Sequence, residues 1–293
     1  MTPRSLLFVP GDSDRKLAKC EAAQADLVIL DLEDSVATDQ KAAARARVGE
    51  FLSARPARSG PQLWVRINPL DTKDALADLA AVAGARPDGI VQPKIRSAND
   101  VLRLAEHLDG FETQHRLERG RMRILPLATE TAQAVFSLGD FSRCGPRLYG
   151  LTWGAEDLSA AVGASDNRQP DGSWTHPYQL ARSLCLFGAA AAGVPAIDTV
   201  HADFRDARGL EAACSEARRD GFVGKLAIHP DQVPIINAGF TPSAEEIARA
   251  TRVVALFRDH PGVATLALDG QMLDLPHLRQ AERILARARA VRP

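Results

Sequence analysis

Short runs of β-branched and aliphatic residues alternate with longer segments of helical periodicity along most of this 293-residue chain. This alternation is typical of βαβ units, in which crossover helices join parallel strands. The predicted strands are Leu6–Pro10, Leu27–Leu32, Leu63–Asn68, Gly89–Lys94, Met122–Leu127, Leu148–Trp153, Ala196–Val200 and Lys225–His229. Eight parallel strands close naturally into a barrel, whereas open doubly wound sheets more often have about five to seven. The sequence therefore predicts a (β/α)8 TIM barrel of the α/β class.

The chain continues well beyond the last predicted strand. We predict one helix around Ser243 to Arg258 and another around Pro276 to Arg289, separated by the segment PGVATLALDGQMLD. Barrels of roughly 250 residues fold as one unit, so the length does not require a second catalytic domain. We assign residues 1–238 to a barrel catalytic domain and residues 239–293 to a C-terminal helical lid extension.

Charge and motifs exclude two classes of ligand. The 36 Lys and Arg residues against 37 Asp and Glu residues give a formal net charge of −1, which provides no positive field for a nucleic acid. The first predicted turn, VPGDSDRK, contains neither a GxGxxG motif nor a P-loop motif. We therefore expect neither a nucleic-acid partner nor a site for a dinucleotide or nucleoside triphosphate at this turn.

The sequence shows no signal of secretion or membrane insertion. Its first apolar run stops at Pro10, too early for a signal peptide, and no stretch approaches the ~18 apolar residues that a membrane helix needs. Cys20, Cys144, Cys185 and Cys214 are far apart and form no CxxC pair, so we interpret them as buried free thiols. We expect a cytoplasmic protein with no membrane partner.

Polar side chains interrupt the apolar runs at one end of most predicted strands. They are Asp31, Glu33, Asp34, Arg66, Asn68, Gln92, Lys94, Glu130, Glu156, Asp157, Asp198, His201, Asp203 and His229. We interpret His201 and His229 as hydrogen-bonded strand-end histidines rather than catalytic bases. The carboxyl ends of barrel strands and the loops after them form one open face, where the chemistry of this fold takes place. The sequence therefore predicts a polar site at that face.

Glu130 and Asp157 follow two neighbouring predicted strands. Each alone could be a helix-capping or first-turn acid, because carboxylates there complement the helix dipole. As a pair, in a face without a cysteine or histidine cluster, they suit a hard cation such as Mg²⁺, which takes one or two protein carboxylates and leaves its other positions to water and substrate. The pair therefore predicts a Mg²⁺ cofactor.

Arg66 lies in the otherwise apolar run LWVRINP. A buried guanidinium needs a partner, because burying it unpaired costs several kcal/mol. One interpretation pairs Arg66 with a structural aspartate inside the barrel mouth. The other interpretation is that Arg66 binds a substrate carboxylate in a bidentate manner, for which its planar guanidinium is better suited than the ammonium group of lysine.

Asp31, Glu33 and Asp34 form a dense acidic segment that needs a cation or basic partners nearby. We expect these three acids and Lys94 to surround the site through hydrogen bonds to Arg66, to each other or to metal-bound water, rather than as direct metal ligands. A Schiff base on Lys94 is an alternative, but a lysine among so many acids is better explained as a charge partner.

Nine motifs occur together in this chain: RSLLFVPGD, ILDLEDSV, VRIN, QPKI, LPLATET, TWGAEDL, AIDTVHADFRD, GKLAIHPDQV and DGQMLDLP. In this order they resemble the HpcH/HpaI aldolase and citrate lyase beta subunit-like family, which includes malyl-CoA and citramalyl-CoA lyases. The resemblance extends from Arg4 to about Ala281, nearly the whole chain.

The resemblance implies roles for individual residues. Glu130 and Asp157 would be the Mg²⁺ ligands, Glu130 would also contact substrate, and Arg66 would bind the carboxylate of a 2-oxo acid. Malyl-CoA and citramalyl-CoA lyases use a late aspartate as acid/base, delivered by a C-terminal lid from a neighbouring subunit. The matching residue is Asp274, with Asp269 as the competing choice. A homo-oligomer is therefore expected, and trimers or hexamers are usual among relatives.

The predicted function is that of a Mg²⁺-dependent carbon–carbon lyase. It would cleave a 3-hydroxyacyl-CoA thioester of the malyl-CoA or citramalyl-CoA type into a 2-oxo acid and acetyl-CoA. One alternative keeps the metal site but changes the reaction, to a citrate lyase beta subunit acting on a carrier-bound citryl thioester or to a thioesterase of malate synthase type. Another is a non-catalytic assembly subunit, against which the intact set of Arg66, Glu130, Asp157 and Asp274 argues.

Overall fold

The computed structural model describes residues 2–55 and 60–290. The chain divides into two compact units, one formed by Pro3–Asn237 and the other beginning at Ala238. The division falls inside helix α9, Gln232–Phe240.

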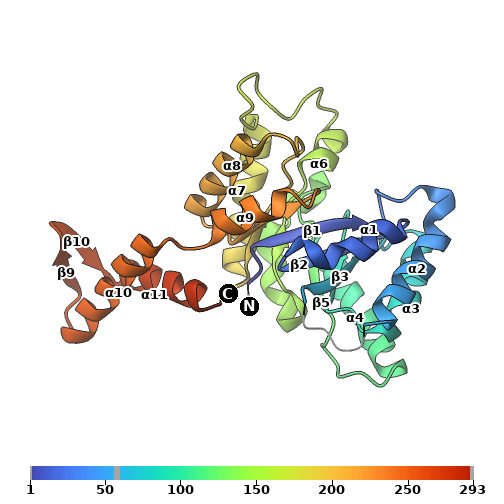
Figure 1. The fold of residues 1–293 in the computed structure, drawn as a ribbon, viewed down its shortest axis with the longest axis horizontal. Coiled ribbons are helices and arrows are strands. Elements are labelled where there is room, and N and C mark those ends of the chain that lie inside the picture. The colour runs from blue at the N-terminus through green and yellow to red at the C-terminus, as the bar shows by residue number, and fades with distance from the viewer. Residues whose placement is uncertain (1, 56–59, 291–293) are drawn as a thin grey trace. The chain divides into compact units, whose positions relative to one another are not determined.

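Eight parallel strands form the sheet at the centre of the first unit (Figure 1). They are β1 (Ser5–Pro10), β2 (Leu27–Asp31), β3 (Gln62–Arg66), β4 (Gly89–Gln92), β5 (Arg123–Pro126), β6 (Leu151–Thr152), β7 (Ala196–Asp198) and β8 (Gly224–Ala227). Their spatial order is β5-β4-β3-β2-β1-β8-β7-β6. Parallel bridges from Ile124 to Leu148 and from Leu127 to Thr152 join the two ends. The predicted barrel is therefore confirmed.

Helices follow most of these strands. They are α1 (Asp14–Lys19), α2 (Lys41–Ser53), α3 (Lys73–Val82), α4 (Ala98–Gln114), α5 (Ala132–Val135), α6 (Ala155–Val162), α7 (His176–Ala191) and α8 (Ala207–Asp220), with a 3-10 segment at Leu138–Arg147 after α5. Several begin at a capping side chain; Ser97, for example, accepts a hydrogen bond from the backbone of Asn99 at the start of α4. No described helix is long and apolar enough to cross a membrane.

Aliphatic side chains and one tryptophan fill the barrel interior. The cluster comprises Leu6, Leu27, Ile29, Trp64, Val91, Leu125, Leu127, Ile197 and Leu226, all at most 3% exposed. Because alternate residues of a strand point to opposite faces, the residues between them face the helices. Leu127 and Leu226 are also among the residues that line the cavity described below.

The second unit contains α10 (Ala244–Asp259), a hairpin of β9 (Thr265–Leu268) and β10 (Gln271–Asp274), and α11 (Leu275–Ala290). Both helices predicted for this region are confirmed, and the segment between them is a two-stranded antiparallel hairpin. Asp269 and Gly270 have positive φ angles, 51° and 77°, as tight hairpin turns require. Ser243 and Glu246 form a capping box at the start of α10.

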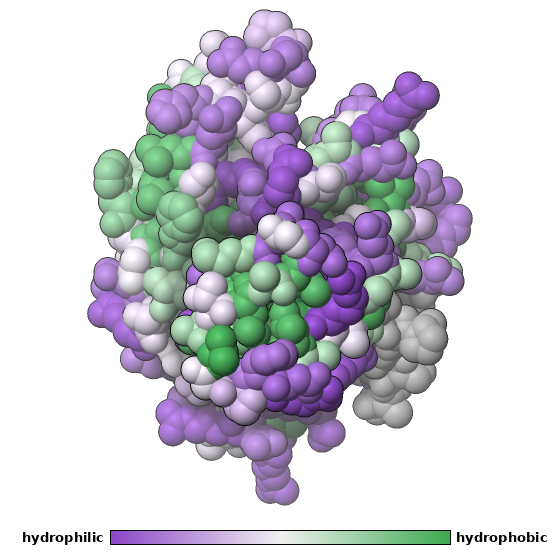
Figure 2. Space-filling model, turned by 90° about the vertical axis from the view of Figure 1, so that its left-hand side faces the viewer, coloured by the Kyte–Doolittle hydropathy of each residue, from purple (hydrophilic) through white to green (hydrophobic). Residues whose placement is uncertain are grey.

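Large apolar side chains remain exposed on the second unit. Val263, Met272 and Leu275 are 44%, 66% and 48% exposed. Figure 2 shows apolar residues gathered at the centre of one face with hydrophilic residues around them. Such a patch is typical of a contact surface.

All four cysteines are buried free thiols, as predicted: Cys20, Cys144, Cys185 and Cys214.

Candidate active site

A cavity of about 260 Å³ opens at the carboxyl ends of the barrel strands. Its charged lining residues are Asp31, Arg66, Glu130, Glu156 and Asp157, contributed by β2, β3 and the segments after β5 and β6. The cavity is also lined by residues of β1, β8 and the segments after β7 and β8: Phe8, Pro10, Thr199, Val200, Leu226 and Ile228. The structure thus brings Arg66, Glu130 and Asp157 to one cavity.

Arg66 is held by two buried carboxylates. Its Nε and Nη2 donate to the two oxygens of Asp31 at 2.7 and 2.6 Å. Its Nη1 forms an ion pair with Glu33 Oε2 at 3.0 Å, although that oxygen lacks hydrogen-bond geometry. The guanidinium also stacks over the Phe8 ring, with Cζ 4.7 Å from the ring centroid.

Both interpretations of Arg66 are compatible with this arrangement. Its pairing with a structural aspartate is present, and its Nη atoms keep N–H groups for which the described part of the chain shows no hydrogen-bond acceptor. Burial disfavours the ionised form of Asp31, but the hydrogen bonds and charge of Arg66 outweigh it and hold the pKa of Asp31 below its ordinary value. Asp31 therefore fixes a charged fork at the cavity wall.

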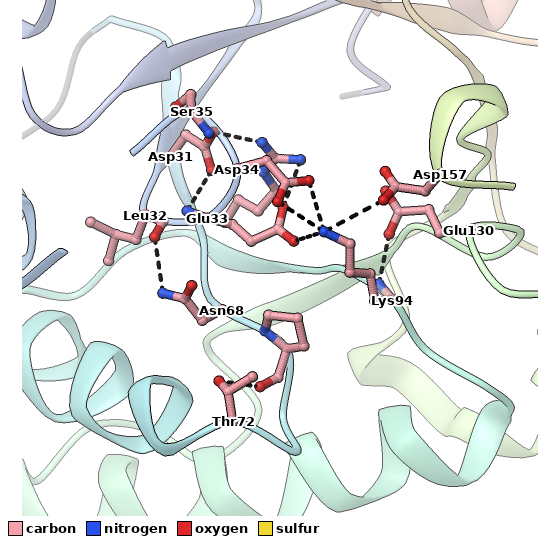
Figure 3. A network of polar contacts seen from close by, with 12 residues as sticks. Asp31, Leu32, Glu33, Asp34, Ser35, Asn68, Thr72, Lys94, Glu130 and Asp157 are labelled. Carbon is pink, nitrogen blue, oxygen red and sulfur yellow. Dashed lines mark hydrogen bonds and ion pairs between the residues drawn. The ribbon is translucent and has the colours of Figure 1, made fainter. Parts of the chain in front are cut away.

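Lys94 connects the acidic segment to Asp157. Its Nζ donates to Glu33 Oε1 at 2.5 Å and to Asp34 Oδ2 at 2.8 Å, and lies 3.5 Å from Asp157 Oδ1. Figure 3 shows the ammonium group between Glu33 and Asp34 on one side and Asp157 on the other. Burial works against its charge, yet hydrogen bonds to Asp34 and Glu33 raise the pKa of Lys94. A Schiff base needs a neutral amine, so this geometry favours a charge partner.

Glu33 itself is 2% exposed, and burial raises its pKa despite the charges of Arg66 and Lys94.

Lys94 adopts a left-handed backbone conformation with φ 50°, which is strained for a residue with a side chain. Strand β4 consequently ends at Gln92, two residues before the predicted end at Lys94.

Glu130 is the more buried of the two predicted metal ligands. It is 4% exposed, and its Oε2 accepts the backbone N–H of Lys94 at 2.6 Å. Burial raises the pKa of Glu130 well above its ordinary value, and the charge of Asp157 adds to the rise. Figure 3 shows the two carboxylates adjacent to each other. A cation between them would relieve both the desolvation and the repulsion.

Helix geometry distinguishes the two acids. Thr131, not Glu130, caps α5 by accepting the backbone N–H of Ala134, so Glu130 has no capping contact. Asp157 lies in the first turn of α6, where the helix dipole favours a carboxylate. Gly154 caps α6, and a Cβ added to it would lie 2.8 Å from Cγ of Glu130, so only glycine leaves room for the Glu130 side chain as it stands.

The donor set fits Mg²⁺ better than a softer metal. Among the residues the structure describes, no group of three or more His, Cys, Asp or Glu side chains could hold a metal ion. Mg²⁺ is commonly held by one or two carboxylates with water and substrate completing its coordination. Glu130 and Asp157 provide such a pair.

The two late aspartates lie in the second unit, and their described contacts stay within it. Asp274 ends β10, and its Oδ1 lies 2.6 Å from Nδ1 of His277. Asp269, in the hairpin turn, accepts from Arg252 at 2.6 Å. The carboxylate of Asp269 is thus bound by an arginine, whereas that of Asp274 contacts a histidine.

The two strand-end histidines do not line the cavity. His201 packs near Asp206, and burial lowers its pKa. His229 stacks on Phe204 with ring centroids 4.6 Å apart.

Two features were missed from the sequence. The apolar part of the cavity wall comes from strand positions that look like ordinary core. The second is the network around Asp198, a residue that the sequence grouped with the polar site. Asp198 is buried, does not line the cavity, and accepts hydrogen bonds from Trp153 at 2.8 Å, Lys225 at 2.7 Å and Arg182 at 3.3 Å. A charged residue within the apolar run GKLA was the available signal for this network.

Known proteins resemble this chain over nearly its whole length. It is 38% identical to a citrate lyase subunit beta-like protein of Mycobacterium tuberculosis, over 96% of this chain and 94% of that protein. It is 35% identical to a (3S)-malyl-CoA thioesterase of Cereibacter sphaeroides (98% and 95%) and 31% identical to the mitochondrial citramalyl-CoA lyase of Rattus norvegicus (99% and 87%).

This chain also resembles solved structures of such proteins. The crystal structure of CitE from Mycobacterium tuberculosis in complex with magnesium, acetoacetate and coenzyme A matches with a TM-score of 0.81 and 37% identity, covering 97% of each chain. The profile of the C-C bond lyases of the TIM-barrel fold matches residues 174–291. The profile of the HpcH/HpaI aldolase/citrate lyase family matches residues 4–230, so the resemblance seen in the motifs is confirmed, and this chain belongs to that family.

Proposed function

We propose that this protein is a Mg²⁺-dependent carbon–carbon lyase that cleaves a 3-hydroxyacyl-CoA thioester of the malyl-CoA or citramalyl-CoA type. The products would be a 2-oxo acid and acetyl-CoA. One observation carries the proposal: buried Glu130 and half-buried Asp157 line the same cavity as the fixed guanidinium of Arg66. A metal-bound hydroxy acid needs both features side by side. The names of the relatives support the thioester.

Glu130 and Asp157 would hold the metal ion. When bound, Mg²⁺ supplies Lewis acidity at the substrate oxygens and offsets their negative charge. Because burial and the charge of Asp157 raise the pKa of Glu130, a proton competes with the ion for this carboxyl, and we expect binding to strengthen as the pH rises.

Arg66 would bind the substrate carboxylate through its remaining N–H groups. Asp31 and Glu33 hold the fork from behind, which reduces the entropy lost when substrate binds. Lys94 holds Glu33, Asp34 and Asp157 in place and donates its backbone N–H to Glu130. These contacts orient the metal ligands without making Lys94 a nucleophile.

The reaction needs one further proton donor. The bond between the hydroxyl-bearing carbon and the acetyl carbon breaks, and its electron pair goes to the acetyl carbon. The hydroxyl proton passes to solvent water as the ketone or aldehyde forms, and this released proton balances the one that the acetyl carbon takes up. A proton must then reach the acetyl carbon. We assign this donor to Asp274, and we assign its delivery to a neighbouring subunit of a trimer or hexamer. The exposed apolar residues of the second unit support such an assembly.

The test is incubation of the protein with Mg²⁺ and a panel of malyl-CoA, citramalyl-CoA and citryl-CoA, followed by mass spectrometry of the products. Equal amounts of acetyl-CoA and 2-oxo acid are expected. Free CoA with the intact hydroxy acid would instead indicate a thioesterase, the activity for which the Cereibacter sphaeroides relative is named. Inertness toward all CoA esters together with cleavage of a carrier-bound citryl thioester would indicate a citrate lyase beta subunit. A Glu130→Ala variant is the control.

A further inference from the structure

The cavity has two chemically different sides. One side carries Asp31 of β2, Arg66 of β3, and Glu130 and Asp157 from the segments after β5 and β6. The other side consists of Phe8, Thr199, Val200, Leu226 and Ile228, from β1, β8 and the segments after β7 and β8. A bound 2-oxo acid whose carboxylate and carbonyl oxygen face the charged side must therefore place its one remaining substituent against the apolar side.

Only one cation lines this cavity among the described residues, and that cation is Arg66. Lys94 is absent from the lining, and its ammonium group is already engaged by Glu33, Asp34 and Asp157. The other charged lining residues are all acidic.

Neutral hydrogen-bond donors are also scarce on the apolar side. Thr199 offers one hydroxyl group, and the indole N–H of Trp153, the largest side chain in the lining, is used by Asp198 at 2.8 Å. A single hydroxyl does not replace the hydration of a carboxylate, and an ionised group moved out of water without a charged partner is strongly disfavoured. A second substrate carboxylate would therefore lie against apolar side chains or next to Glu130, Glu156 and Asp157.

We infer that the apolar side, formed by Phe8, Val200, Leu226 and Ile228, selects 2-oxo acids with a single carboxylate and rejects those with two. This inference rests on the proposed function, since it assigns the substituent carried by the carbonyl carbon of the product. Hydrogen or a methyl group fits this side, as in glyoxylate or pyruvate. A carboxymethyl group, as in oxaloacetate, does not.

Two matched pairs of probes isolate this group. Citramalyl-CoA and citryl-CoA differ only in a methyl against a carboxymethyl group on the carbon that carries the hydroxyl. Their products, pyruvate and oxaloacetate, differ in the same way. Calorimetric titration of each acid at fixed free Mg²⁺ concentration, and cleavage rates for each ester, therefore measure one substitution in two independent readouts.

Pyruvate should bind at least about 100-fold more tightly than oxaloacetate, and kcat/KM should favour citramalyl-CoA over citryl-CoA by a similar factor. Equal or tighter binding of oxaloacetate, or equal cleavage of both esters, would overturn the inference while leaving the lyase proposal intact. Absence of cleavage of every ester, with no Mg²⁺-dependent binding of either acid, would instead overturn the proposed function and this inference with it.

Ile228 allows a second test, because it lines the cavity and is 42% exposed, so a longer side chain has room at the rim. Ile228→Arg adds a cation to the apolar side and should reduce the preference for pyruvate by about tenfold or more. Ile228→Gln is the matched control for polarity and should leave the preference within about threefold of the unmodified protein. If the preference for pyruvate over oxaloacetate is unchanged in Ile228→Arg, or is reduced equally in both variants, the apolar side does not discriminate against the second carboxylate.

Discussion

Gly154→Ala should damage the metal site through a single methyl group. Gly154 has φ −120° and ψ 120°, a conformation open to any residue, so alanine introduces no backbone strain. Its Cβ would lie 2.8 Å from Cγ and 3.2 Å from Oε1 of Glu130. The first distance falls about 0.6 Å short of the 3.4 Å at which ordinary contact begins.

Glu130 has little room to move away. It is 4% exposed and its other oxygen is fixed by the backbone N–H of Lys94 at 2.6 Å. Overpacking of this kind costs about 1–3 kcal/mol of folding free energy. Displacing a residue that orients a metal ligand typically reduces metal affinity about 10- to 100-fold. We expect both effects in Gly154→Ala.

The matched control is Gly110→Ala, in the middle of α4, where an added Cβ meets nothing within 4 Å. This variant should gain about 0.5–1 kcal/mol of stability, because alanine is the better helix former, and keep its Mg²⁺ affinity. Mg²⁺ affinity is measured by calorimetric titration and stability by urea denaturation. If Gly154→Ala binds Mg²⁺ as tightly as Gly110→Ala, Glu130 is not a metal ligand in the conformation described.

Three further predictions concern the other groups of the site. Mg²⁺ affinity, measured by calorimetric titration, should rise with pH by up to about tenfold per pH unit below the raised pKa of Glu130, because the ion competes with a proton for this carboxyl. The Glu130→Gln variant should bind Mg²⁺ weakly and should lose this pH dependence. Arg66→Lys should weaken pyruvate binding at least about tenfold and destabilise the fold by about 1–3 kcal/mol, because lysine cannot reproduce the fork on buried Asp31, while calorimetry should still detect Mg²⁺ binding. The Asp274→Asn variant should no longer catalyse exchange of the acetyl-CoA methyl protons with D₂O, measured by NMR, but should still bind Mg²⁺ and pyruvate. Unaltered exchange would reject Asp274 as the acid/base.

The strands could be predicted from the sequence because their signal is local. Each apolar run is bounded by polar or turn residues, and parallel connections place all carboxyl ends at one end of the barrel. That rule alone predicts that Arg66, Glu130 and Asp157 lie together although they are far apart in the chain, and the structure places all three at one cavity. The rule uses strand direction only and needs no side-chain detail.

The pairing of side chains could be predicted less fully from the sequence. The sequence left open whether Arg66 pairs with an aspartate or a substrate, and the structure shows that its fork uses Asp31 and keeps further N–H groups. The lack of space for a Cβ at Gly154, 2.8 Å from Cγ of Glu130, depends on how two segments pack after β5 and β6, which no periodicity encodes. Asp274 lies in the second unit, so the role that we propose for it would depend on assembly rather than on strand order.

A crystal structure of the protein with Mg²⁺ and pyruvate would show whether the proposed site holds both. We expect one ion bonded to a carboxylate oxygen of Glu130 and one of Asp157 at about 2.0–2.1 Å, with the pyruvate carboxylate on Arg66 and its methyl group against Val200 and Leu226. An ion bound elsewhere, or pyruvate bound away from Arg66, would contradict this expectation.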